Sequence, residues 1–188
     1  MNQKGILLLA ILSTLSFSLA HGAELDSLVA GARRLYYASV NDKTQIDPAI
    51  AMFTKISHAD EAWRGRALTY IGSLIALKAK FAFWPNEKWD LAKMGLRLMD
   101  EGVAHDTDDV EALFIHGATC FYLPIFFGRA DDAQNQLRRI VQLLPERMHQ
   151  YDSALVVNVI QFLFENLRLS RAERQRLNEL KNISLVQK

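Results

Sequence analysis

An alanine that leads a short apolar pattern recurs three times in this chain, each time with the spacing i, i+4, i+7. That spacing places the three residues of each copy on one face of a helix. The copies lie 43 and 41 residues apart and read Ala49-Phe53-Ile56, Ala92-Leu96-Met99 and Ala133-Leu137-Ile140. A repeat of this length is typical of arrays of helical hairpins, in which each unit buries its apolar face against its neighbours. The pattern therefore predicts an all-α repeat array, a class of protein that usually binds partners.

The rest of the chain agrees with an all-helical fold. No stretch alternates between apolar and polar residues as a strand series would, and proline and glycine fall mainly at the expected helix ends. Asp47 and Pro48 predict the start of one helix as N-cap and first helical residue, and Ser170 with Glu173 forms a capping box at the start of another. We expect about eight helices, over residues 25–40, 47–57, 60–83, 85–104, 106–124, 129–144, 148–168 and from 170 onward.

The first twenty residues have the features of a secretory signal peptide. Lys4 supplies a positive charge, residues 6–12 are apolar and uncharged, and small residues allow cleavage after Ala20 or Gly22. The alternative is an uncleaved membrane anchor, for which the apolar stretch is short. We therefore predict a signal peptide at 1–20, a repeat domain at 21–168, a C-terminal capping helix and tail at 169–188, and a periplasmic or secreted location.

Charge and cysteine content exclude several classes of protein. Without residues 1–20 the chain has 21 basic and 21 acidic residues, which argues against nucleic acid and against electrostatic attachment to a membrane. Cys120 is the only cysteine, so no internal disulfide can form and stability must come from packing. No later stretch is long and apolar enough for a membrane span, so we expect no transmembrane segment in the mature chain.

The repeat pattern resembles that of tetratricopeptide-repeat proteins in a degenerate form. In that family a small residue of the first helix faces an alanine of the second helix, and a proline closes the unit. Gly117, Ala133 and Pro145 match these positions in one unit, and Ala76 and Ala92 match the first two one unit earlier. The resemblance covers roughly residues 25–168, and it implies a right-handed array of antiparallel helix pairs.

Two units share one departure from that family. Gly117 precedes Ala133 by 16 residues, as Ala76 precedes Ala92, which is about one helical turn more than the family pattern. The extra residues fall in the segments 81–89 and 121–129, each of which holds several aromatic residues, one proline and one late cation. Because loops of successive repeats line up along one edge of an array, we expect the two segments to be neighbours in space.

Six residues of these segments form the predicted partner-binding site, an aromatic platform with a cationic rim that suits an apolar or anionic group. They are Trp84, Lys88, Trp89, Phe126, Phe127 and Arg129. Aromatic residues and arginine are the types most often dominant at interfaces. The alternative interpretation is that the aromatic side chains fold back over the helices and extend the core, which would leave only a small exposed apolar patch.

Few residues point to other chemistry. His116 and Cys120 have an i, i+4 spacing that suits a metal ligand pair, but no further pair lies at a diagnostic distance, which favours simple packing beside Gly117. The segment 105–109 lacks the glycine and closing glutamate of a calcium loop and is better explained as a helix N-cap. The chain has no nucleophile elbow, phosphate loop, dinucleotide fingerprint or zinc-binding histidine pair. We therefore expect no catalytic residue, no metal and no cofactor.

Two functional hypotheses follow. The first is an exported interaction or scaffold protein that docks a protein partner, as an accessory component of an envelope assembly or transport system. The second is an extracytoplasmic binding protein for a small apolar or anionic ligand held between the two segments, and an enzyme ranks third. A concave pocket between the segments favours a small ligand, whereas an open groove favours a peptide or protein.

Overall fold

The computed structural model describes residues 22–186, and over these residues it is helical without strands. A first helix covers residues 22–39, and seven further α-helices follow. These are α2 Ile46–Ala59, α3 Arg64–Phe81, α4 Pro85–His105, α5 Val110–Tyr122, α6 Ala130–Arg147, α7 Ser153–Asn166 and α8 Arg171–Val186. Short 3-10 turns lie at Lys43–Gln45, Glu61–Trp63, Ile125–Phe127 and Met148–Gln150. The predicted all-α array is confirmed for the described residues, and the predicted signal peptide lies outside them.

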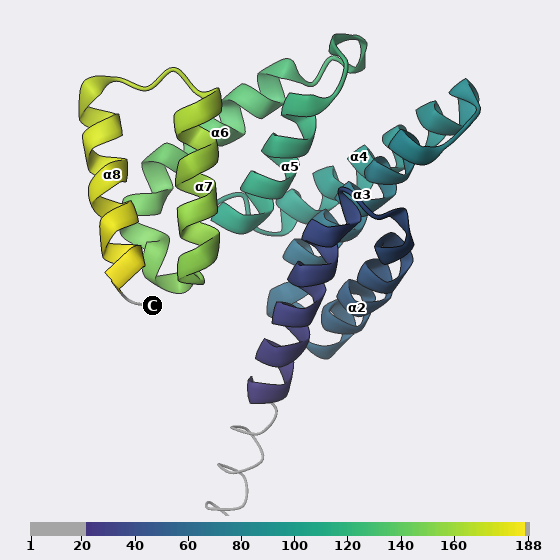
Figure 1. Cartoon of the computed structure of the whole chain (residues 1–188), viewed down its shortest axis with the longest axis horizontal. Coiled ribbons are helices and arrows are strands. Elements are labelled where there is room, and N and C mark those ends of the chain that lie inside the picture. The colour runs from purple at the N-terminus through teal and green to yellow at the C-terminus, as the bar shows by residue number, and fades with distance from the viewer. Residues whose placement is uncertain (1–21, 187–188) are drawn as a thin grey trace, which may run out of the picture.

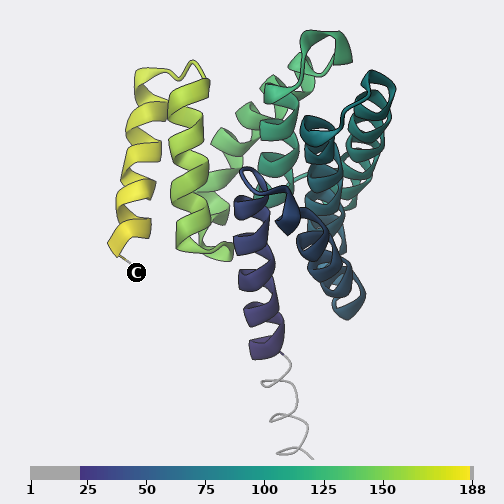
Figure 2. The same ribbon diagram turned by 45° about the vertical axis from the view of Figure 1, so that its right-hand side comes forward.

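Successive helices pack as antiparallel pairs, and the pairs lie side by side (Figure 1). The most extensive contacts join α3 to α4 and α5 to α6, and α7 pairs with α8. Figure 2 shows the α7–α8 pair at one end of the array and the α3–α4 hairpin at the other. Contacts of α3 with α2 and with α5 hold neighbouring pairs together. None of the described helices is long and apolar enough to span a membrane.

The three alanine-led copies supply much of the core. All nine of their residues are buried, because each copy faces the neighbouring helices. A large apolar cluster runs through the array, and a smaller one lies where α3, α4, α5 and α6 meet. The smaller cluster contains Ala76, Leu96, Met99, Cys120 and Ala133. The segments predicted to form the binding edge follow directly on from this smaller cluster, since Phe127 packs against it.

Glycines mark a close approach of the α3 and α4 backbones. A Cβ atom placed on Gly72 would lie 2.6 Å from the carbonyl oxygen of Gly95, and one on Gly102 would lie 2.6 Å from that of Gly65. Both distances are too short for a carbon–oxygen contact, and both involve backbone atoms that cannot rotate away. Two glycines seven residues apart on each helix therefore let the two backbones touch.

Side-chain caps fix the starts of α5, α7 and α8. The Asp109 carboxylate accepts a hydrogen bond from the Ala112 N–H at 2.8 Å. At α8 the Glu173 carboxylate accepts from the Ser170 N–H at 2.7 Å, and the Ser170 hydroxyl accepts from the Glu173 N–H at 3.2 Å. This reciprocal pair is the predicted capping box.

Three predicted helix boundaries are wrong. Asp47 is not the N-cap of α2, because Asp42 caps the preceding 3-10 turn, which runs straight into the helix. Pro145 does not end α6, since its missing N–H falls in the last turn and the buried Leu144 keeps that turn packed. Residue 148 does not begin α7, because Asp152 accepts hydrogen bonds from the next two N–H groups and starts the helix at Ser153.

Candidate functional site

The two aromatic segments adopt different local structures although their lengths match. In the first, Pro85 occupies the first turn of α4, where its lack of an N–H is harmless, and Lys88 and Trp89 are already helical. In the second, residues Ile125–Phe127 form a 3-10 turn that ends at Gly128, whose φ of 68° is left-handed. Glycine adopts that conformation without strain, and it directs the chain into α6.

The two segments meet through their aromatic rings, as expected for loops on one edge of an array. The Trp89 indole stacks on the Phe127 ring with centroids 4.8 Å apart and lies 6.0 Å from the Phe126 centroid. The Lys93 ammonium lies 5.7 Å from the centroid of the Trp89 ring. Offset stacking of this kind adds to the stabilisation that comes from burial of the rings alone. The three rings form one wall that links the α3–α4 hairpin to the loop after α5.

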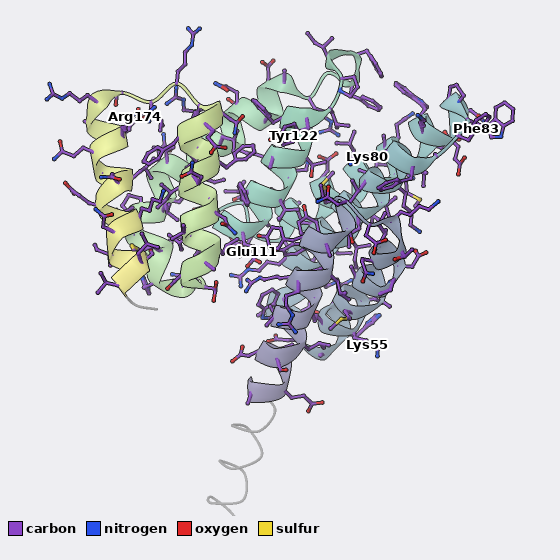
Figure 3. All side chains as sticks on the ribbon, viewed as in Figure 1. Lys55, Lys80, Phe83, Glu111, Tyr122 and Arg174 are labelled. Carbon is purple, nitrogen blue, oxygen red and sulfur yellow. The ribbon has the colours of Figure 1, made fainter. Side chains whose placement is uncertain are left out.

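Behind this wall lies a concave cleft with a volume of about 830 Å³. The first helix, α3, α4, α5 and the loop 123–127 all contribute to it, and most of the lining is apolar. Figure 3 labels two lining residues, Lys80 on α3 and Tyr122 on α5, which come from the two hairpins that flank the cleft. The residues that line it are Tyr36, Val40, Ser73, Ala76, Leu77, Ala79, Lys80, Pro85, Lys88, Trp89, Ala92, Ala118, Thr119, Tyr122, Leu123, Pro124, Phe126 and Phe127.

A chain of hydroxyl groups crosses the part of the cleft that lies farthest from the hairpin loops. The Tyr36 hydroxyl lies 3.0 Å from the Ser73 hydroxyl, which lies 2.9 Å from that of Thr119. Thr119 donates in turn to the Ile115 carbonyl at 2.8 Å. Burial raises the pKa of Tyr36 to about 12, so the phenol stays neutral at physiological pH. These polar groups satisfy one another, and the rest of the surface is left to apolar contacts.

Two lysines supply the charge of the cleft. Lys80 donates a hydrogen bond to the Val40 carbonyl at 2.8 Å, and Lys88 lies on the first turn of α4. No aspartate or glutamate is among the lining residues. The cleft therefore combines an apolar interior with an excess of positive charge.

The six predicted site residues divide into two groups. Lys88, Trp89, Phe126 and Phe127 line the cleft. Trp84 does not, because it packs edge-on against Phe83 in the loop between α3 and α4, where both rings are exposed to solvent.

Arg129 also lies outside the cleft. Its guanidinium binds both carboxylate oxygens of Asp100, at 3.0 and 2.6 Å, and the Asp132 carboxylate at 2.8 Å. The hydrogen bonds that Arg129 donates to Asp100 raise the Arg129 pKa above its ordinary value. The side chain thus ties α4 to α6 at the edge of the cleft, a geometry unlike that of Lys88, its counterpart in the repeat register.

His116 and Cys120 are both buried and lie side by side in the packed interior. The two ring nitrogens of His116 lie 2.6 Å from the Gln136 amide oxygen and 3.0 Å from an Asp100 oxygen. Burial raises the pKa of the Cys120 thiol to about 12, which favours the protonated form at neutral pH. In the described residues no group of three or more His, Cys, Asp or Glu side chains is arranged to hold a metal ion.

A buried ion pair that the sequence did not predict joins the first helix to α5. The Glu111 carboxylate binds the Arg33 guanidinium at 2.8 and 2.5 Å and accepts a hydrogen bond from Tyr70 at 2.7 Å. Burial lowers the Arg33 pKa, but the charges and hydrogen bonds of Glu111 and Tyr70 together more than offset this, and the net pKa is raised. The guanidinium carbons of Arg33 and Arg66 lie 5.5 and 4.9 Å from the centroid of the Trp63 ring. No lining residue of the cleft takes part in these contacts, so this network is separate from the cleft.

The residues predicted from the sequence include four that line the cleft, Lys88, Trp89, Phe126 and Phe127, but none of those on the first helix, α3 or α5. Tyr36, Ser73, Lys80 and Thr119 belong to three helices, and only tertiary packing brings them together. One local signal was available, since Ser73, Leu77 and Lys80 share one face of α3 at helical spacing.

The chain matches no protein-family model, no curated protein and no solved structure.

Proposed function

We propose that this protein is a binding protein that takes a small, largely apolar ligand into the cleft between the α3–α4 and α5–α6 hairpins. The single observation that carries this proposal is the cleft itself, whose volume of about 830 Å³ suits a small molecule. Its volume and largely apolar lining suit a small ligand, which is the second hypothesis drawn from the sequence.

The lining explains what kind of interaction the cleft offers. Trp89, Phe126 and Tyr122 expose much of their apolar surface to the cleft or to solvent. Removing apolar surface from water is favourable by roughly 25 cal/mol per Å². A ligand that covers these rings therefore gains affinity without needing a reactive group. This supports binding, and not catalysis, as the role of the site.

A fluorescence titration tests the proposal. Nile Red, a neutral apolar dye, should bind the protein with increased emission, and Ala118→Trp should abolish this binding by filling the cleft with an indole ring. Ala51→Trp is the matched control, because Ala51 is exposed on α2, away from the cleft. Ala79→Trp fills the cleft from α3 in case the first variant does not fold. Equal dye binding by the wild type and both folded cleft variants would refute the proposal.

A protein partner is the second candidate, and one observation favours it. Phe83, Trp84 and Ile125 are 80%, 63% and 88% exposed in the loops beside the cleft, although none of them lines it. Exposed aromatic residues in neighbouring loops are typical of interface hot spots. In a pull-down from the native envelope, Phe83→Ala with Trp84→Ala should then lose a partner while Nile Red binding persists. A partner retained by this double variant would refute docking through the loops.

We also propose that the protein is exported and belongs among degenerate tetratricopeptide-like arrays. The basis for export is the charged and apolar pattern of residues 1–20 with its small-residue cleavage site. The basis for the assignment to this family is the spacing of 41 and 43 residues between the alanine-led copies. The pairing of successive helices is consistent with that spacing. N-terminal sequencing of the protein from the producing cell should begin at His21 or Ala23. An intact Met1 in a membrane fraction would contradict export as a cleaved protein.

A further inference from the structure

We propose that the ligand of the cleft is a linear amphiphile with an anionic head group, which Lys80 and Lys88 bind while its apolar chain lies against Leu77 and Trp89. This inference rests on the proposed function, because it assumes that the cleft is the binding site. It adds the chemical class of the ligand.

The shape of the cleft favours a linear molecule. On α3 the lining residues include Ser73, Leu77 and Lys80, and the first and last of these are about 10 Å apart along the helix at 1.5 Å per residue. On α4, which is antiparallel to α3, the lining residues extend from Pro85 near the loop through Trp89 to Ala92. The cleft therefore follows two neighbouring helices for about two turns, which suits an extended chain.

Polarity changes along this path. The hydroxyls of Tyr36, Ser73 and Thr119 lie at one end and already pair with one another or with the backbone. Lys80 and Lys88 lie at the other end, near the loop that joins α3 to α4. The middle is apolar. An amphiphile therefore matches the cleft in one orientation, with its head at the lysines and its chain toward the hydroxyls.

The charges of the cleft favour an anion over a neutral or cationic head. Among the described residues, Lys88 makes no ion pair within 4.0 Å, whereas Lys78 on α3 pairs with Asp47 at 2.6 Å. Lys80 uses one donor on the Val40 carbonyl, and an ammonium group has three. Glu87 and Asp90 are neighbours of Lys88 in the sequence, but neither lines the cleft. Donors for a carboxylate are thus present, and no lining residue carries a negative charge to compete.

Displacement of Nile Red from the full-length chain tests this class directly. Three competitors have an unbranched chain of twelve carbons, counting the carboxyl carbon of laurate, and differ in the head: laurate, lauryl alcohol and lauryltrimethylammonium, each below its micellar concentration. A hydrogen bond to a charged group contributes enough free energy that laurate should displace the dye at roughly tenfold lower concentration than the alcohol. The ammonium compound should be the weakest competitor of the three. Added salt should weaken the binding of laurate alone.

Lysine variants assign the head-group contact. Lys80→Gln and Lys88→Gln should each weaken the binding of laurate by roughly threefold to tenfold and leave the binding of lauryl alcohol unchanged. Lys55→Gln is the matched control, because Lys55 is an exposed lysine on α2 far from Lys80 (Figure 3). Its laurate binding should equal that of the wild type.

The outcomes separate this inference from the proposed function. Equal displacement by laurate and lauryl alcohol, or an equal loss in Lys55→Gln and Lys88→Gln, would overturn the anionic head while the apolar cleft stands. Failure of Nile Red to bind the folded wild type would overturn both. Selective loss of laurate in the two cleft lysine variants would support both.

Discussion

The indole ring of Trp89 stacks on the phenyl ring of Phe127, with centroids 4.8 Å apart and planes inclined by 25°. Trp89 belongs to α4 and Phe127 to the turn before α6, so this contact joins two hairpins across the edge of the array. Phe127 also packs against the small apolar cluster below it. Phe127 therefore fits both interpretations of the aromatic segments, because it extends the core and also lines the cleft.

Replacing the two adjacent phenylalanines should separate these roles. Phe127→Ala should lower the free energy of unfolding by about 1–3 kcal/mol, less than the 3–5 kcal/mol of a fully buried phenylalanine, because the ring is only partly buried. Phe126→Ala should change stability by less than about 1 kcal/mol, since its ring is 68% exposed. Urea unfolding measures the free energy of unfolding of each variant. Nile Red titration measures dye binding, which both variants should weaken. A Phe127→Ala variant as stable as the wild type would show that Phe127 does not belong to the core.

The close contact of α3 and α4 predicts a strong effect of one methyl group. Gly95→Ala would place a Cβ atom 2.6 Å from the Ala76 nitrogen, and pushing the helices apart should destabilise the protein by about 1–3 kcal/mol. Gly31→Ala is the control, because its new Cβ would meet the ends of two flexible side chains, Met52 and Arg34, which can move. Thermal unfolding should show a clear loss for Gly95→Ala alone. Equal midpoints for the two variants would contradict the glycine contact.

The buried ion pair of Arg33 and Glu111 predicts a large cost of neutralisation. Glu111→Gln leaves the Arg33 guanidinium without its countercharge in a largely buried site, which should destabilise the fold by about 3–5 kcal/mol. The exposed pair of Lys78 and Asp47 provides the comparison, and Asp47→Asn should change stability by about 0–1 kcal/mol. Denaturant midpoints at neutral pH measure both. Similar values for the two pairs would show that Glu111 is not essential to the junction.

Buried neutral groups predict a loss of stability in alkali. Burial raises the pKa of Cys120 from 9.0 to about 12 and that of Tyr36 from 10.0 to about 12. Between the unfolded-state and folded-state pKa values, the folded protein keeps protons that the unfolded chain has released. The free energy of unfolding therefore falls as pH rises from about 9 to about 12. The double variant Cys120→Ala with Tyr36→Phe should show a shallower fall in its urea midpoint over this range. A slope identical to that of the wild type would contradict the shifted pKa values.

Some parts of this structure follow from local sequence, and others do not. The alanine-led copies predict the buried faces because helical spacing alone decides which residues share a face. Trp89 and Phe127 were placed near each other because loops of successive repeats share an edge. Lys80 and Thr119 were missed, since their approach depends on how α3 packs against α5. Arg33 and Glu111 are 78 residues apart in the chain and leave no local signal of their pairing.

The α3–α4 glycines are an intermediate case. Gly65 and Gly72 are seven residues apart, as are Gly95 and Gly102, and this spacing puts each pair on one helix face. The spacing alone predicts that one face of each helix has no side chains at these two positions. Only the packing of the hairpin shows that the two faces meet.

The tryptophan indole N–H signals offer the most direct test of the binding cleft. Trp89 lines the cleft, Trp84 lies in the adjacent loop outside it, and Trp63 lies in the buried charge network. In a two-dimensional nitrogen–proton NMR titration with lauryl alcohol, each signal being assigned by a Trp→Phe variant, the cleft account predicts a saturable shift of the Trp89 signal and none of the Trp63 signal. A titration that shifts only Trp84, or that shifts none of the three, would contradict it.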